Sequence, residues 1–177
     1  MEEDDDAILV RRCLEGDEEA FERIVDKYQK AVVNLALRMI TDYQDAEDVT
    51  QSVFVKLFEK LETFNPKYKF FSWLYRIAVN ESLNFLDQRK HFEELSSEII
   101  SDEKTPEEAY DEIEATRDVQ KALMTLKPEY RIAVVLKHFQ DLSYEEISRI
   151  LDIPEKTVKS RLFTARQLLG KVLLRKA

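Results

Sequence analysis

Glycine is nearly absent from this sequence, and its absence narrows the choice of fold class. The 177 residues include only two glycines, Gly16 and Gly170. No Asn-Gly or Asp-Gly dipeptide is present to build a tight β-hairpin turn. Glu, Lys, Leu, Ala and Arg, which favour helices, are abundant instead. We therefore predict an all-α protein.

Cysteine and long apolar runs are also scarce. Cys13 is the single cysteine, so no disulfide can form within the chain, which is typical of proteins of the reducing cytoplasm. No apolar run approaches the roughly 20 residues that span a bilayer. The acidic start MEEDDD lacks the basic residues of a signal peptide. We therefore expect a cytoplasmic protein with no membrane insertion.

Motifs for catalysis, cofactors and metals are missing as well. The two histidines, His91 and His138, lack the Glu-x-x-His and His-x-x-x-His spacings of helical metal sites. No glycine-rich phosphate loop occurs, and no nucleophile, base and acid can be nominated as a set. We therefore expect no enzyme activity, no cofactor and no metal site.

Charge is distributed in blocks, although the whole chain carries −9. Residues 63–91 hold five basic and two acidic side chains, and residues 127–177 hold eleven basic and six acidic ones. The segments 1–62 and 92–126 are strongly acidic. Because physiological salt screens charges more than about 8 Å apart, the local sign matters more than the total. The basic blocks suit DNA, and the acidic blocks suit water or a basic protein partner.

Apolar residues recur at helical spacing over most of the chain, and the four prolines stand at the breaks. Helices are expected over 5–14, 17–39, 42–61 and 70–89, and then over 105–127, 128–141, 143–151 and 155–169. Residues 92–104 have no apolar stripe and are acidic, which indicates a linker. The chain is therefore predicted to form two small helical domains, 1–91 and 105–177, joined by this acidic linker.

The stretch 142–169 has the pattern of a helix-turn-helix. Ser143 and Glu146 have the spacing of a capping box, and Pro154 fits the first turn of the following helix. From Glu155 to the end there are seven basic residues and one acid, which favours a helix in the DNA major groove over an ordinary helical hairpin. The candidate DNA-binding residues are Lys156, Lys159, Ser160, Arg161, Phe163, Thr164 and Arg166.

A second stretch combines aromatic rings with lysines. Six aromatic residues fall between Phe64 and Tyr75. Core packing is the ordinary explanation for Phe71 and Trp73, but rings beside lysines in a proline-containing loop suit stacking on unpaired bases, worth roughly 1–3 kcal/mol per base. The candidates for binding single-stranded DNA are Phe64, Lys67, Tyr68, Lys69, Tyr75, Arg76, Asn80 and Asn84. For the two asparagines, ordinary exposed amides are the alternative.

An acidic face is expected at the start of the helix over 42–61. Asp45, Glu47, Asp48 and Gln51 point outward there, and a helix N-terminus favours acids. The charge pattern leaves two interpretations open, a solvated face and a docking site for a basic partner.

Taken in order, these stretches resemble the extracytoplasmic-function group of bacterial sigma factors over nearly the whole chain. The matching segments are Asp45-Ala46-Glu47-Asp48, Phe71-Ser72-Trp73-Leu74-Tyr75-Arg76-Ile77-Ala78 with Asn80, Leu142-Ser143-Tyr144-Glu145-Glu146-Ile147 and Thr157-Val158-Lys159-Ser160-Arg161-Leu162. The resemblance implies a sigma factor that directs core RNA polymerase to specific promoters and promotes DNA melting.

The resemblance also implies a partner for each surface. Asp45, Glu47, Asp48 and Gln51 would bind core RNA polymerase, whose β′ and β subunits are the expected partners. The candidates between Phe64 and Asn84 would bind the −10 element as a single strand. The basic helix from Glu155 would bind the −35 element as a duplex. An anti-sigma factor that covers these surfaces is a further expected partner.

Three positions depart from the family pattern. Lys156 and Asp152 stand where the family usually has glycine, and Thr164 stands where it usually has arginine. The preferred −35 sequence therefore does not follow from the resemblance. The alternatives are an ordinary helix-turn-helix transcriptional regulator with a helical partner-binding domain, and a helical adaptor that binds only proteins.

Overall fold

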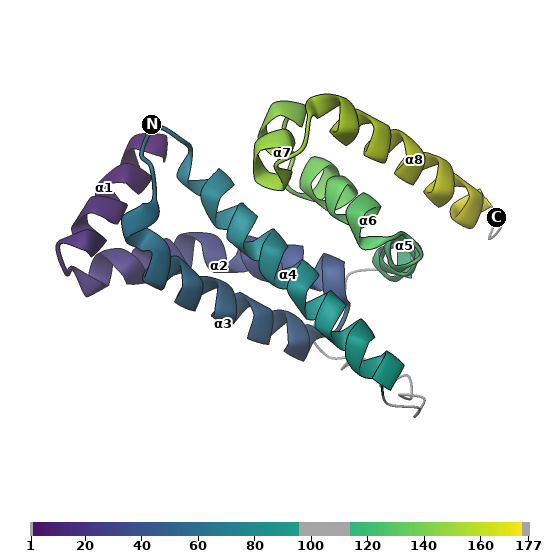
Figure 1. Cartoon of the computed structure of the whole chain (residues 1–177), viewed down its shortest axis with the longest axis horizontal. Coiled ribbons are helices and arrows are strands. Elements are labelled where there is room, and N and C mark those ends of the chain that lie inside the picture. The colour runs from purple at the N-terminus through teal and green to yellow at the C-terminus, as the bar shows by residue number, and fades with distance from the viewer. Residues whose placement is uncertain (1, 96–113, 175–177) are drawn as a thin grey trace.

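The computed structural model describes residues 2–95 and 114–174, and these two ranges are almost entirely helical with no strand (Figure 1). The first range contains α1 (Glu2–Leu14), α2 (Glu18–Ile40), α3 (Tyr43–Lys60), the 3-10 turn η1 (Leu61–Thr63) and α4 (Phe70–Leu95). The second contains α5 (Glu114–Met124), α6 (Pro128–Val134), the π turn η2 (Val135–Phe139), α7 (Tyr144–Leu151) and α8 (Glu155–Leu174). The predicted all-α fold is confirmed.

Short polar side chains begin these helices as the sequence indicates. The Asp17 side chain accepts a hydrogen bond from the Ala20 amide, and Asp42 does the same for Asp45. Ser143 and Glu146 form the complete capping box at the start of α7. Each cap satisfies an amide that has no partner within its own helix, and so fixes where the helix begins.

The first half is a bundle of α2, α3 and α4, with α1 packed on α2. Ile24 and Leu35 of α2, Leu57 of α3 and Leu74 of α4 are fully buried in its core. In the second half α8 packs on α6 and α7, and its buried stripe of Val158, Leu162 and Ala165 agrees with the predicted helical spacing.

Several helix ends differ from the sequence prediction, and the end of α4 changes the expected linker. Helix α4 continues to Leu95, so residues 92–95, which were expected in the linker, are helical. Glu93 and Glu94, which look like linker acids, form ion pairs with Arg89 and Lys90 one turn earlier and extend the helix. The predicted start of the following helix at residue 105 lies outside the described residues.

The π turn changes the expected orientation of one side chain. The spacing predicts that Phe139 faces inward, but its side chain is 39% exposed. A π turn has more residues per turn than the α-helix on which that prediction rests. The Phe139 ring instead lies against the Arg38 guanidinium, 4.4 Å from the ring centre.

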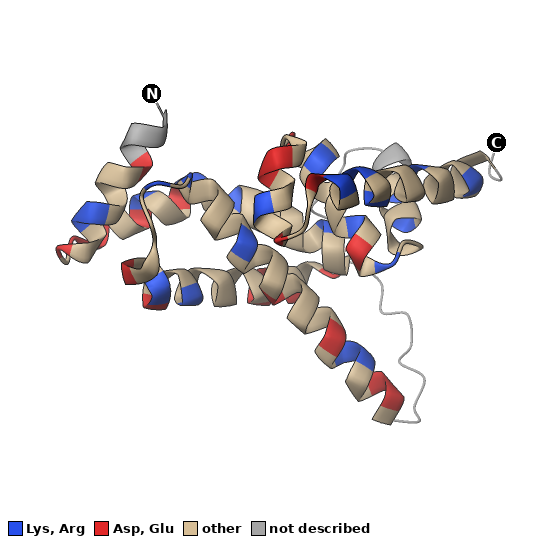
Figure 2. Cartoon of the chain, turned by 45° about the horizontal axis from the view of Figure 1, so that its top comes forward, with Lys and Arg blue, Asp and Glu red and all other residues tan. Residues whose placement is uncertain are grey.

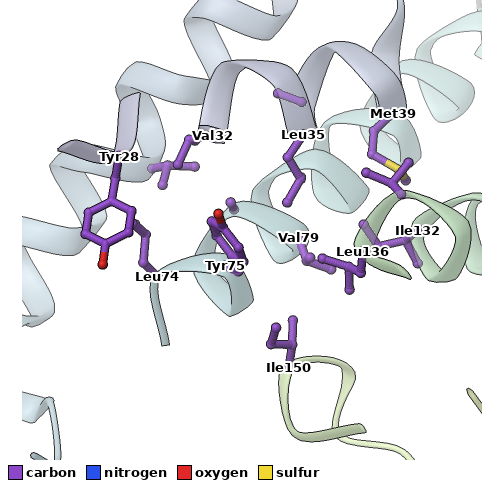
Figure 3. Close-up of a cluster of buried hydrophobic side chains, with 14 of the residues drawn as sticks. Tyr28, Val32, Leu35, Met39, Leu74, Tyr75, Val79, Ile132, Leu136 and Ile150 are labelled. Atoms are coloured by element: carbon purple, nitrogen blue, oxygen red, sulfur yellow. The ribbon is translucent and has the colours of Figure 1, made fainter. Parts of the chain in front are cut away.

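The two halves share one hydrophobic core. Figure 3 shows Leu35 and Met39 of α2 facing Ile132 and Leu136 of the second half, with Val79 of α4 beside them. All five are buried. The second half therefore packs directly on the helices of the first, and α7 lies against α4.

Candidate nucleic-acid interface

The loop before α4 (residues 64–69) contains two aromatic rings, of which Tyr68 is exposed and Phe64 is packed. Tyr68 is 60% exposed, and Lys67 and Lys69 on either side of it are exposed as well. Phe64 is half-buried, with its ring centre 5.4 Å from that of Phe70 and 5.3 Å from that of Trp73. The exposed Tyr68 ring between two cations is thus suited to stacking on a base, while Phe64 forms the floor of the loop.

Helix α4 continues this surface. Arg76, Asn80 and Asn84 are exposed and follow one another at intervals of four residues, so they lie along one face. The asparagine amides offer both donors and acceptors, and the arginine offers a cation. The structure therefore places these three candidates along one face of α4, with Arg76 nearest to the aromatic loop.

Tyr75 differs from the other candidates because it is buried, with 7% exposure. Its hydroxyl donates a hydrogen bond of 3.0 Å to Oε1 of Gln140 in the second half. Its ring packs edge-on against Phe71, and burial raises the pKa of the Tyr75 hydroxyl. In this arrangement the second half covers Tyr75, although the sequence predicts contact with DNA.

The acidic face of α3 is partly paired and partly free. Asp48 and Gln51 are exposed, whereas Asp45 and Glu47 are half-buried. The Arg89 guanidinium lies 3.3 Å from a carboxylate oxygen of Asp45. Burial, together with repulsion from Asp42, raises the pKa of the Asp45 carboxyl. Of the four candidates, Asp48 and Gln51 are therefore the most available to a partner.

Sequence reasoning missed two apolar residues on this face. Val55 is 57% exposed and Phe58 is 63% exposed, and Val55 lines a shallow groove with Asp48, Gln51 and Lys56. Val55 lies two residues from both Val53 and Leu57, off the core stripe, which is the signal that could have found it. Phe58 follows the buried Phe54 by four residues and packs edge-on against Phe21, so its spacing gave no such signal. The candidate docking face is therefore acidic at its start and apolar farther along α3.

Helix α8 exposes five of its seven candidates, namely Lys156, Lys159, Ser160, Phe163 and Arg166. Arg161 and Thr164 are half-buried, because they flank the core residues Leu162 and Ala165. Figure 2 shows the Lys and Arg positions along α8. Phe163 is 65% exposed between these polar groups, as an apolar contact for a thymine methyl requires.

Tyr144 organises two of the cations near α8, a role that the sequence pattern did not reveal. The Nζ atoms of Lys137 and Lys159 lie 5.2 and 5.4 Å from the centre of its ring. Each distance is within the range of a cation–π interaction. In the sequence, an aromatic residue directly after a helix cap is only a weak signal for such a role, because a ring at that position fits the hydrophobic core equally well.

Within the described residues no group of three or more His, Cys, Asp and Glu side chains is placed to hold a metal ion. No helix in these ranges is long and apolar enough to cross a membrane.

Comparison with known families covers both halves. The model for sigma-70 region 2 matches residues 24–92, and the model for sigma-70 region 4 matches residues 116–169. The first match holds the α3 face and the α4 surface, and the second holds the helix-turn-helix.

Whole-chain relatives give the same result. The chain is 36% identical to the RNA polymerase sigma-H factor of Pseudomonas aeruginosa, across 98% of this chain and 96% of that protein. It is 33% identical to the extracytoplasmic-function (ECF) RNA polymerase sigma factor SigW of Bacillus subtilis, across 93% and 94%. It is 34% identical to the ECF sigma-E factor of Escherichia coli K12, across 92% and 91%.

Two solved structures share the fold, each with a TM-score of 0.75 and 25% identity. CnrH in complex with the cytosolic domain of CnrY covers 98% of this chain and 99% of its own. The sigma factor RpoE of Bartonella quintana, in complex with the anti-sigma factor NepR, covers 86% and 96%. The chain therefore belongs to the extracytoplasmic-function group of sigma-70 family RNA polymerase sigma factors.

Proposed function

We propose that the described surfaces divide the work of a sigma factor between the two halves of the chain. One observation carries this proposal: exposed Arg76, Asn80 and Asn84 follow one face of α4 beside the Tyr68 loop. This surface combines the rings, amides and cations that bind an unpaired strand. The first half thus holds the −10 element once the DNA opens.

The α3 face binds core RNA polymerase. Asp48 and Gln51 provide exposed polar groups, and Val55 and Phe58 provide apolar area next to them. A charged rim beside exposed apolar residues is typical of a protein–protein interface. A basic, partly apolar helix of the polymerase β′ subunit is the partner that this face fits.

The α8 surface binds the −35 duplex. Lys159, Ser160 and Phe163 stand at successive exposed positions of the helix-turn-helix, where side chains reach base edges in the major groove. Arg161 and Arg166 contribute cations for phosphates. Lys156 and Thr164, which depart from the family pattern, set the sequence preference of this particular chain.

We further propose an anti-sigma factor as a regulatory partner, because the similar proteins CnrH and RpoE were solved in complexes with CnrY and NepR. The protein works in the cytoplasm, where polymerase and promoters are found. Residues 1–91 and 105–177 form the two functional domains, with the acidic segment 92–104 between them.

The strand-binding role of α4 is tested by Asn80→Ala in the holoenzyme. Promoters are first selected from random duplexes by the wild-type holoenzyme, and their melted bases are mapped with permanganate. The variant should reduce melting about tenfold, since a lost base contact costs about 1–3 kcal/mol. Asn34→Ala, which removes an exposed amide from α2, is the matched control and should leave melting unchanged. Equal melting by all three proteins would refute the assignment.

A further inference from the structure

Part of the surface proposed to bind the −10 strand is already contacted by helix α7 of the same chain. Lys69 Nζ lies 3.4 Å from a carboxylate oxygen of Glu146, at the start of α7. Arg76 Nη2 lies 3.3 Å from a carboxylate oxygen of Asp152, just after the end of α7. Two cations that are suited to DNA phosphates are therefore paired with acids of the other half.

Other groups of α4 near these ion pairs also contact the second half. Gln140 accepts the hydrogen bond from Tyr75. Asn80 lines a groove between the halves together with Leu151, Ile153 and Arg161. The surface of α4 thus meets acids, an amide and apolar side chains of the second half where a strand would offer phosphates and bases.

A second set of contacts holds the halves together at the end of α2. The last carbonyls of a helix have no partner within it and need donors from elsewhere. Gln120 Nε2 donates to Leu37 O at 3.0 Å, which also accepts from the Thr41 amide, and Arg131 Nη1 donates to Met39 O. Gln120 Oε1 in turn accepts from Arg38 Nη1 at 3.0 Å. The second half therefore serves as the C-terminal cap of a first-half helix.

We propose that α7 is an intramolecular competitor of the −10 strand, so that the free chain masks its own single-strand site. Glu146 and Asp152 take the place of phosphates on Lys69 and Arg76, and the α2 cap fixes α7 over α4. Strand binding and this closed arrangement exclude each other, because both use the same cations and the same face of α4. The proposal rests on the proposed strand site of α4.

The energetic consequence follows from the population of the open form. When only a fraction of molecules exposes a site, the apparent affinity for its ligand falls by that fraction. Exposed ion pairs and single hydrogen bonds each contribute modestly, so removing several of them raises the fraction of open molecules, while the apolar contacts between the halves remain. The apparent affinity for the strand should then rise.

The test is a triple variant, Gln120→Ala, Glu146→Gln, Asp152→Asn, studied as the full chain. Gln at position 146 retains the capping box, and Asn at position 152 tolerates the positive φ of 54° there. The probe is a fluorescent single strand with a −10 sequence that the holoenzyme melts. We expect the variant to bind it about tenfold more tightly than the wild-type chain.

The matched control is Gln29→Ala, Asp141→Asn, Glu145→Gln. It removes the same groups from exposed positions, and Asp141 also has positive φ, at 51°. Glu145 pairs with Arg149 inside α7, not with α4. This control should bind the strand as the wild-type chain does. An equal gain in both triple variants would overturn the proposal, because the effect would then come from net charge.

A cross-link tests the same idea in the opposite direction. Arg38→Cys and Gln120→Cys in a Cys13→Ser background place thiols at two positions whose native side chains touch. A cleavable bismaleimide should hold the chain closed and weaken strand binding at least tenfold relative to the cleaved protein. Unchanged binding by the linked protein would contradict self-masking.

The outcomes also separate this proposal from the assignment of the strand site. If the triple variant gains no affinity while Asn80→Ala still impairs melting in the holoenzyme, self-masking is wrong and the strand site stands. If the triple variant gains the same affinity for scrambled strands as for the −10 sequence, α4 does not read that sequence. The assignment of α4 as the −10 strand site would then be wrong.

Discussion

At the scale of single residues, Arg131 shows how one side chain joins the two halves. It is 7% exposed, and its guanidinium donates to the carbonyls of Leu123, Met124, Leu126 and Met39. Burial lowers the pKa of Arg131. A buried charge is costly unless it is hydrogen-bonded, and here the negative ends of α5 and α2 supply the acceptors. No carboxylate pairs with it in the described structure.

Arg131→Met should therefore destabilise the protein strongly. The variant keeps an apolar stem of similar length but removes the guanidinium donor from four carbonyls, of which Leu123 O keeps a second donor, the Leu126 amide. We expect the free energy of unfolding in urea to fall by about 2–4 kcal/mol. Arg149→Met removes an exposed arginine whose partner is Glu145, one turn away, and should change stability by less than about 0.5 kcal/mol. Equal losses of unfolding free energy in the two variants would show that the hydrogen bonds from Arg131 to the buried helix ends contribute nothing to stability.

His138 makes stability depend on pH. Partial burial of this largely exposed side chain, and then repulsion from Arg166 and Lys137, lowers the pKa of His138 below its usual 6.5. The unfolded chain therefore binds the proton more tightly than the folded chain, so stability is full above pH 6.5 and declines as the pH falls below it. His138→Gln should flatten the urea-unfolding stability profile between about pH 7 and pH 5. A profile as steep as that of the wild-type protein would refute this role.

At the scale of helices, local chemistry predicted the boundaries better than it predicted the packing. The Asp17, Asp42 and Ser143 caps could be read from sequence because each acts on amides within three residues. The π turn over Val135–Phe139 could not, because no local signal distinguishes it from an α-helical turn. The same limit explains why Phe139 was expected to be buried.

Helix α8 should bind duplex DNA with a salt dependence set by its cations. Each phosphate contact releases counterions, so binding weakens with salt in proportion to the number of contacts. Arg161→Ala and Arg166→Ala should each reduce the slope of log affinity against log salt by about one. The measurement is a titration of the holoenzyme on −35 duplexes over a range of salt concentrations. If both slopes equal the wild-type slope, α8 does not contact phosphates.

At the scale of the whole molecule, the candidate sites could be predicted but their relation to each other could not. Arg76, Asn80 and Asn84 share the face that their spacing predicts. Tyr75 lies on the same helix, yet its hydroxyl donates to Gln140, 65 residues away. Hydrophobic periodicity shows that a stripe is buried but not what buries it. The contacts between the halves therefore became visible only in the structure.

The central claim is that one chain reads two promoter elements with two separate surfaces. The most direct test is run-off transcription by core polymerase with the wild-type chain, Asn80→Ala or Lys159→Ala, on promoters with an intact or scrambled −10 or −35 element. Substituting a residue that reads an element should cause no further loss of transcription once that element is scrambled. Each protein variant and the scrambled form of its DNA site therefore make a double-mutant cycle. The account predicts that scrambling −10 abolishes only the Asn80 effect and scrambling −35 only the Lys159 effect. Defects that persist unchanged on every scrambled promoter would contradict it.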